Sequence, residues 1–216
     1  MKMKDYLLNP DIVRYIEESI LPCYDSFDLG HRRDHALNVI DAALYLSSFY
    51  DVDRNMVAVA AACHDLGLRY GREDHHLSSG RIIRADERLK EWFSEEQIET
   101  IAEAAEDHRA SSGHEPRGIY GKITAEADRQ IIPETIIRRT IQYGLHNYPQ
   151  LDKEGHWSRM LEHMAEKYEE GGYLKLWIPQ SANAGRLREL REIIKDKALL
   201  RKYFDEIFEA ESAGLC

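Results

Sequence analysis

Cysteine is scarce in this 216-residue chain: there are three, Cys23, Cys63 and Cys216, and they are far apart. An odd number of isolated cysteines argues against a disulfide framework and fits a reducing compartment, so we expect a cytoplasmic protein. Long apolar runs are missing too, because no stretch approaches the roughly 18 residues that a membrane-spanning helix needs. The first ten residues also lack the apolar core of a secretory signal. We therefore expect no membrane association.

Positive charge is in deficit, with 29 basic against 39 acidic residues and a formal net charge of −10. This balance disfavours a nucleic-acid polymer or an anionic membrane as the main partner, although a local basic pocket remains possible. A serine-nucleophile elbow and a glycine-rich phosphate loop are both absent from the sequence. Nothing in the sequence indicates an oligomeric state.

Strand-type alternation with hairpin turns is absent as well, whereas helical periodicity runs through most of the chain. We therefore predict an all-α protein of about nine or ten helices. In the first half, the predicted helices cover 11–20 (closed by Leu21-Pro22), 34–49, the apolar run 57–63 ending at Gly67, about 77–92, and 95–109 with a Ser94/Gln97 capping box. A short helix at 123–132 follows. Pro133 then opens another, and two or three amphipathic helices come after residue 151, broken at Gly171-Gly172 and around 178–185.

The run VAVAAACHDLG places two ionisable residues, His64 and Asp65, at the end of the most apolar helix. His108 continues the series Ile98, Ile101 and Ala105, which defines the inward face of its helix. His35 lies in the first turn of another apolar helix. Any one of these histidines would more often be a hydrogen-bonded core residue than a ligand. Together with the Asp65 carboxylate they favour a divalent cation, which would satisfy all of them at once.

Adjacent residues in a helix point about 100° apart, so His64 and Asp65 can reach one ion only where the backbone leaves ideal geometry. The helix end at Gly67 allows that departure. A carboxylate there has a second oxygen free to bridge to another ion.

The ordered set His35, His64-Asp65, His76, His108 and Asp128 resembles the HD-domain superfamily of metal-dependent phosphohydrolases. The matching segments are RRDHALNV, AACHDLG, HHLSSGRII, AEDHR and KITAEADR. The resemblance covers about residues 28–135. It implies an all-α HD core over 28–135, preceded by an N-terminal helix in 1–27. A C-terminal helical lobe over 136–216 would pack on this core, so that the whole chain forms a single compact domain.

Carried over to this chain, the resemblance implies that His35, His64, Asp65 and Asp128 hold one metal. Asp65 would bridge to a second ion held by His76 and His108, and His64 and Asp65 would be the catalytic pair. The cofactor would be one or two divalent ions of Mn, Fe or Mg. The choice between His75 and His76 stays open, because the two are adjacent and the spacing from His64 is short. If neither reaches the site, a mononuclear centre remains.

The activity implied is hydrolysis of a phosphomonoester or phosphodiester of a nucleotide or other small metabolite by metal-activated water. The substrate phosphate needs donors, and the basic residues flanking the ligands are Arg33, Arg69, Arg72, Lys122 and Arg129. For each, a surface salt bridge is at least as good an interpretation. Two alternatives stay open: a di-iron oxygenase of the same superfamily, and a non-enzymatic helical binding module with a structural metal. We interpret His31, His114, His146, His156 and His163 as loop, surface or packing residues.

Overall fold

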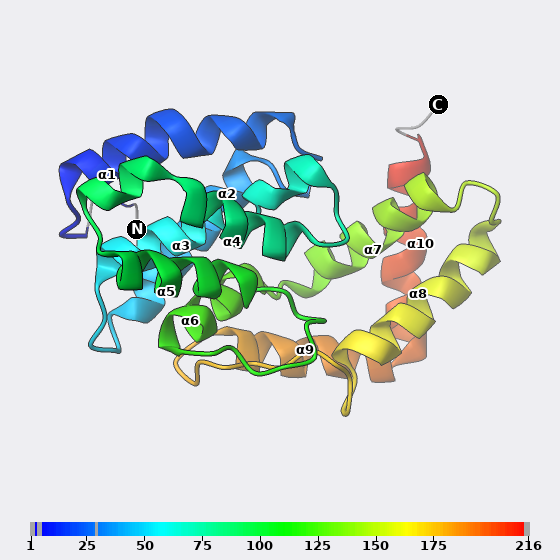
Figure 1. Ribbon diagram of the computed structural model, residues 1–216. Coiled ribbons are helices and arrows are strands. Elements are labelled where there is room, and N and C mark those ends of the chain that lie inside the picture. Colours follow the sequence, from blue (N-terminus) through cyan, green and yellow to red (C-terminus); the bar gives the residue numbers. More distant parts are fainter. Residues whose placement is uncertain (1–2, 4–5, 29, 214–216) are drawn as a thin grey trace. The chain divides into compact units, whose positions relative to one another are not determined.

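The computed structural model describes residue 3 and residues 6–28 and 30–213. Within these residues there are ten α-helices and no strand, which confirms the all-α prediction. The helices are α1 (Pro10–Tyr15), α2 (Arg33–Ser47), α3 (Arg54–Cys63), α4 (His75–Ala85), α5 (Glu95–Glu106), α6 (Ile119–Asp128), α7 (Pro133–Asn147), α8 (Lys153–Tyr168), α9 (Asn183–Lys195) and α10 (Lys197–Ala213). Their order along the chain can be followed by colour in Figure 1.

The chain divides into two compact units. The first comprises the described residues up to Gln130 together with Leu176–Ser181, and the second comprises Ile131–Lys175 and the described residues from Ala182 onward. Helices α1 to α6 thus belong to the first unit and α7 to α10 to the second. That the C-terminal lobe packs on the core as one compact domain stays a prediction.

The first predicted helix begins as expected, because the Asn9 side chain accepts a hydrogen bond from the Asp11 N–H at 2.9 Å and Pro10 occupies the first helical position. The prediction that Leu21-Pro22 closes it is wrong. After Tyr15 the chain passes into a π-helical segment, Ile16–Ile20, and then a 3₁₀ helix, Leu21–Ser26. Pro22 is tolerated because the first residues of a new helical segment need no intrahelical N–H donor.

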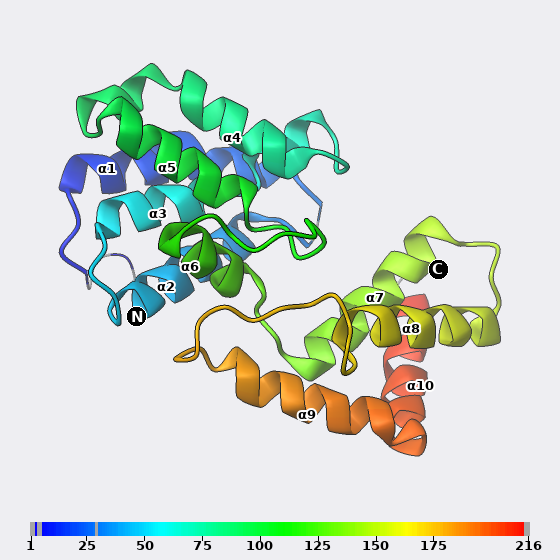
Figure 2. The same ribbon diagram turned by 60° about the horizontal axis from the view of Figure 1, so that its bottom comes forward.

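Helix α3 is the centre of the first unit. It packs against α2, α5, α6 and the π-helical segment, and Figures 1 and 2 both show it between these elements. Every residue from Met56 to Cys63 is buried. Alanine supplies much of this surface, and its small side chain lets neighbouring helices approach closely. The helix therefore holds the residues that follow it, His64 and Asp65, in a fixed position.

The helix predicted over about 77–92 is interrupted. Helix α4 ends at Ala85, and a separate 3₁₀ helix covers Glu87–Glu91. Asp86 adopts an extended conformation (φ −83°, ψ 99°) and its side chain accepts from the Arg88 N–H at 3.0 Å. An aspartate that caps the next turn competes with helix continuation, and periodicity alone does not reveal this.

Other helix boundaries follow the local signals. The Ser94 side chain accepts from the Gln97 N–H at 3.3 Å while the Gln97 side chain accepts from the Ser94 N–H at 2.9 Å, so the predicted capping box is confirmed. Pro133 is the first residue of α7, as expected.

The second unit is built on α7, which packs against α8, α9 and α10. The predicted two or three C-terminal helices are three, α8, α9 and α10, interrupted by 169–182 and by Asp196. The fully buried apolar residues of the second unit include Ile137, Met160, Met164, Leu190, Ile194, Leu200 and Phe204.

Residues Leu176–Ser181 return from the C-terminal part of the chain to the first unit. The Trp177 N–H donates to Oε2 of the fully buried Glu126 at 2.7 Å, and the Trp177 side chain packs against the core of this unit. Trp177 thus anchors this returning segment by packing.

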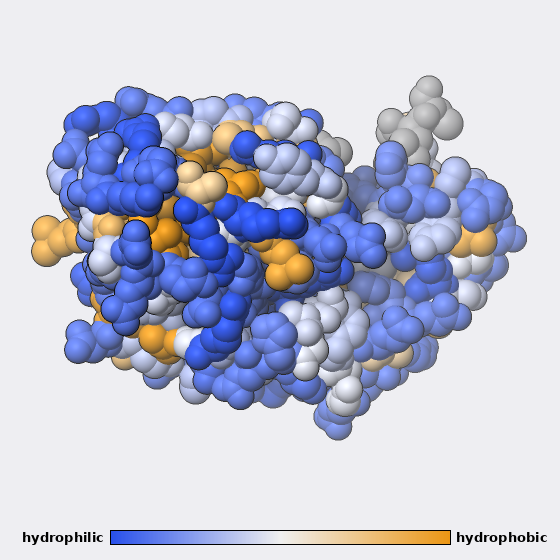
Figure 3. Space-filling model, in the orientation of Figure 1, coloured by the Kyte–Doolittle hydropathy of each residue, from blue (hydrophilic) through white to orange (hydrophobic). Residues whose placement is uncertain are grey.

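On the face shown in Figure 3, hydrophilic residues cover most of the surface and hydrophobic residues form small groups. None of the described helices is long and apolar enough to cross a membrane.

Candidate metal centre

The His64–Asp65 pair lies where α3 ends. Helix α3 stops at Cys63, His64 is its C-terminal cap, and Asp65 leaves the helical conformation with φ −106° and ψ 5°. Both side chains are almost fully buried. The hydroxyl of Tyr24 donates to the Ala62 carbonyl at 2.8 Å and accepts from the Asp65 N–H at 3.4 Å, which fixes this backbone turn.

The expected departure from helical geometry near Gly67 occurs at Asp65. Gly67 itself has no positive φ, so its role is one of packing and not of backbone conformation. A side chain at this position would overlap the His75 carbonyl oxygen and would lie 2.7 Å from Ser78 Cβ and Ser79 N. The Gly67 N–H also donates to the buried Ser79 hydroxyl at 2.9 Å. Glycine is required here because α4 approaches the backbone after Asp65 directly.

Three histidines have their Nδ1 atoms bonded to the backbone carbonyl three residues earlier. The contacts are His64 Nδ1 to Ala61 O at 2.8 Å, His75 Nδ1 to Arg72 O at 2.8 Å and His108 Nδ1 to Ala105 O at 2.6 Å. A carbonyl accepts only, so each Nδ1 carries the proton in the neutral ring and each Nε2 presents its lone pair. The backbone at these three helix ends thus selects the tautomer suited to metal binding.

The first group of donors contains His35, His64 and Asp65. The two Nε2 atoms lie 3.3 Å apart, and Asp65 Oδ2 lies 3.1 Å from His64 Nε2 and 3.6 Å from His35 Nε2. Asp128 approaches the same histidines from α6, with Oδ1 at 3.2 Å from His35 and 3.6 Å from His64. The structure therefore brings together the four residues expected at the first metal, and the Asp128 side chain remains 26% exposed.

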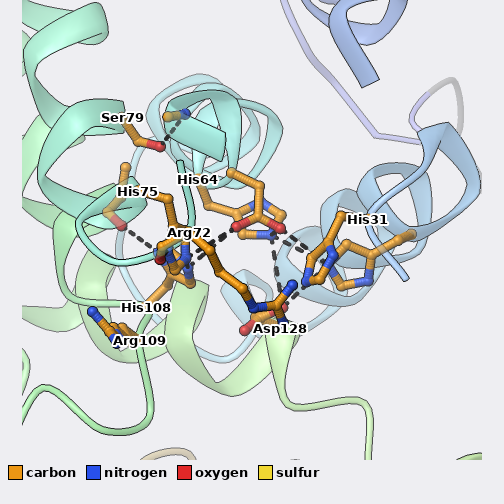
Figure 4. Close-up of polar contacts among 12 residues, drawn as sticks. His31, His64, Arg72, His75, Ser79, His108, Arg109 and Asp128 are labelled. Carbon is orange, nitrogen blue, oxygen red and sulfur yellow. Dashed lines mark hydrogen bonds and ion pairs between the residues drawn. The ribbon is translucent and has the colours of Figure 1, made fainter. Parts of the chain in front are cut away.

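The second group contains Asp65, His75 and His108. Asp65 Oδ1 lies 3.4 Å from Nε2 of each histidine, and the two Nε2 atoms lie 3.1 Å apart. The two oxygens of one carboxylate thus face two different histidine pairs. Figure 4 shows His64, His75, His108 and Asp128 converging on this point.

The histidine of α4 in this cluster is His75, and the set that included His76 is corrected accordingly. His75 is the first residue of α4, where its ring can reach back over the preceding turn to Arg72 O. His76 is rotated by about 100° around the helix. Its Nδ1 is buried without a hydrogen-bond partner, and the charges of Arg109 and His108 add to burial in lowering its pKa.

Charges within the cluster shift the pKa values of its members in opposite directions. Burial lowers the pKa of His64, but Asp65 and Asp128 outweigh it and raise the value well above the ordinary one. Burial raises the pKa of Asp65, but the surrounding histidines bring it well below its usual range. Burial and the neighbouring His108 lower the pKa of His75 to about 4, so that this ring is neutral near pH 7.

The donor set fits a divalent cation. His75 and His108 direct lone pairs at each other across 3.1 Å, an arrangement that is repulsive unless a positive charge lies between them. Donor atoms bound to one ion at about 2.1 Å lie roughly 3.0–3.5 Å apart, close to the spacings observed here. Imidazole with carboxylate suits Mn, Fe or Zn better than Mg, which prefers oxygen ligands alone.

Four of the five basic residues that flank the expected ligands, Arg33, Lys122, Arg129 and Arg69, are in different environments. Arg33 pairs with Asp25 at 2.8 Å, and Lys122 pairs with Glu115 at 2.5 Å. Arg129 follows Asp128 directly, and its Nε and Nη1 atoms are buried without a hydrogen-bond partner. Arg69 is exposed and has no ion pair or hydrogen bond with any residue that the structure describes.

His31 lies in the loop before α2, as expected, and belongs to neither donor group. Its Nδ1 lies 2.7 Å from Asp28 Oδ1, and its ring meets that of His35 edge-on at 5.8 Å between centroids. Of the outer histidines, His156 is a packing residue at 3% exposure.

Comparisons with known proteins point to one domain family for the part of the chain that carries the cluster. The family model of the HD domain matches residues 32–137, just under half of the chain, so this part is similar to the HD superfamily. A solved structure described as a predicted HD superfamily hydrolase from an uncultured Thermotogales bacterium is similar, with 20% sequence identity and a TM-score of 0.48. The match covers 72% of this chain and 84% of that one. The search of curated proteins found no similar sequence.

Proposed function

We propose that the cluster holds two divalent cations and that the protein hydrolyses a phosphomonoester or phosphodiester of a nucleotide or other small metabolite. The observation that carries the proposal is the position of the Asp65 carboxylate, whose Oδ2 faces His35 and His64 while Oδ1 faces His75 and His108. Two bound cations would supply an activated water molecule and would neutralise charge on the phosphoryl oxygens.

The residues of this chain would have distinct roles. His35, His64 and Asp128 would hold one ion, His75 and His108 the other, and Asp65 both. The backbone carbonyls behind His64, His75 and His108 orient the rings, so little reorganisation accompanies metal binding.

Arg129 is the best supported substrate-binding residue next to the cluster. Two of its guanidinium nitrogens are buried and unpartnered, and an oxyanion would satisfy them. Arg33 and Lys122 are paired with surface carboxylates, and their binding of substrate stays a prediction. A small substrate rather than a nucleic-acid polymer agrees with the net charge of −10. The cytoplasmic location also stays a prediction.

The test is metal analysis of the purified protein, followed by a phosphatase and phosphodiesterase panel with Mn²⁺, Mg²⁺ and Fe²⁺. Asp65→Ala should abolish turnover and lower the metal content, whereas Asp51→Ala, at an exposed loop position, should change neither. A protein that binds no metal, or that hydrolyses none of these phosphoesters after reconstitution, would contradict the proposal. Iron with substrate-dependent oxygen uptake would indicate an oxygenase, and a ligand bound equally well by Asp65→Ala would indicate a binding module.

A further inference from the structure

A cavity of about 440 Å³ lies in the first unit, between residues 26–28 and the segment that follows Asp65. Its lining residues are Ser26, Phe27, Asp28, Leu68, Arg69 and Arg72. One wall is formed by Ser26, the last residue of the 3₁₀ helix Leu21–Ser26, and by Phe27 and Asp28 directly after it. The other comes from the 3₁₀ helix Leu66–Tyr70, which begins directly after Asp65, and from the turn before α4. The volume lies within the range of pockets for small ligands.

This cavity borders the cluster through a short chain of contacts. Asp28 Oδ2 accepts from Arg72 Nη1 at 3.3 Å, while Asp28 Oδ1 lies 2.7 Å from His31 Nδ1. The His31 ring contacts His35, and the Arg72 carbonyl orients His75. Figure 4 shows the Arg72 side chain reaching from the His75 side of the cluster toward His31.

The charge in this cavity favours an anion. Arg69 and Arg72 contribute two guanidinium groups against one carboxylate, and Asp28 is already engaged by His31 and Arg72. Arg69 has no ion pair or hydrogen bond among the described residues, so all its donors are available. Planar guanidinium groups bind phosphate and carboxylate through paired hydrogen bonds.

We propose that this cavity binds a second oxyanion of the substrate, a phosphate or a carboxylate, while the phosphate ester to be cleaved lies at the metal cluster. Arg69 is the principal donor, Arg72 the second, and the side chains of Phe27 and Leu68 cover the carbon skeleton between the two anionic groups. The inference rests on the proposed function and narrows its substrates to small phosphate esters that carry another anionic group.

The test compares three related probes by isothermal titration calorimetry on the full chain reconstituted with Mn²⁺. Glycerol 3-phosphate has one anionic group, 3-phosphoglycerate adds a carboxylate, and 2,3-bisphosphoglycerate adds a phosphate as well. We expect the wild-type protein to bind at least one of the two latter probes about tenfold more tightly than the first, as one charged hydrogen-bonding pair would give. The probe that shows the increase in affinity tells whether carboxylate or phosphate is preferred.

Arg69→Gln should remove that preference, and Arg69→Lys should keep part of it. Arg14→Gln, an exposed arginine on α1 outside the cavity, is the matched control and should behave as wild type. Circular dichroism and metal content show that each variant is folded and loaded.

Three results would overturn the inference: a preference that survives Arg69→Gln, a preference lost equally in Arg14→Gln, or no preference in the wild-type protein. These outcomes are separable from failure of the proposed function. An Arg69-dependent preference without turnover would retain the anion subsite and reject the hydrolase. Turnover without that preference would retain the hydrolase and reject the anion subsite.

Discussion

Gly67 and His75 are in backbone contact, because the space that a Gly67 side chain would need is filled by the His75 carbonyl oxygen. Gly67 follows Asp65 by two residues, and His75 is the first residue of α4 and a member of the second donor group. The spacing of the two donor groups therefore depends on the absence of one side chain.

Gly67→Ala should lower the free energy of unfolding by roughly 1–3 kcal/mol, since an added methyl group in a close-packed contact forces the backbone apart. It should also reduce the metal content, because the shift separates His75 from Asp65. Urea unfolding and metal analysis measure the two effects. Gly185→Ala on α9 is the control: its nearest neighbour would be Arg188 Nη2 at 3.9 Å, so its stability should be equal or higher. Normal stability and normal metal content in Gly67→Ala would contradict this account.

His75→Ala and His76→Ala form a matched pair. Because His75 Nε2 lies 3.4 Å from Asp65 Oδ1 whereas His76 belongs to neither donor group, only His75→Ala should lower the metal-to-protein ratio, from two toward one. Metal stoichiometry after dialysis measures this, with circular dichroism as a check of folding. Loss of one ion in His76→Ala and none in His75→Ala would show that His76, as the family resemblance implied, is the ligand.

Glu106→Ala should destabilise the fold by roughly 1–3 kcal/mol. The Glu106 side chain is 11% exposed and binds both Arg84 and Arg117, so its removal leaves two guanidinium groups without their shared partner. Urea unfolding measures the change. The control is Glu103→Ala. The Glu103 carboxylate is 38% exposed and lies 3.4 Å from Arg117, a longer contact than that of Glu106. The free energy of unfolding of this variant should stay within about 0.5 kcal/mol of wild type. Equal effects of the two substitutions would show that burial of Glu106 does not matter.

His163 should make stability depend on pH in the acid range. Burial, with smaller effects of Lys167 and Arg159, lowers its pKa from 6.5 to about 4 in the folded protein. Between these values the unfolded chain binds a proton that the folded chain does not, so this contribution is complete above pH 6.5 and is lost as the pH falls toward 4. The loss should be roughly 1–3 kcal/mol.

Urea unfolding at several pH values tests the His163 prediction. His163→Gln should reduce the slope between pH 4 and 6.5, while His146→Gln, at an exposed position on α7, should leave it unchanged. An unaltered slope in His163→Gln would show that the ring is accessible to protons in the folded state.

The helices themselves were largely predictable, because their signals are local. Asn9, Ser94 and Pro133 open helices as their chemistry dictates, and the inward direction of His108 follows from the spacing of Ile98, Ile101 and Ala105. The predicted helix boundaries were wrong where a local preference was balanced by packing. Pro22 lies in the first turn of a 3₁₀ segment instead of ending the helical region, and Asp86 caps a new turn inside a continuous periodic pattern.

The all-α class, the inward-facing histidines and the ordered residue set that resembles the HD superfamily could be read from the sequence alone, because helical periodicity and residue type are properties of short segments. The packing of the helices decided which of two adjacent histidines reaches Asp65, since this depends on where α4 begins against the turn at Gly67. It also decided which basic residues are engaged by surface carboxylates and which, like Arg69 and Arg129, are not. These choices depend on contacts between segments far apart in the chain, whose relative positions the packing of the helices sets.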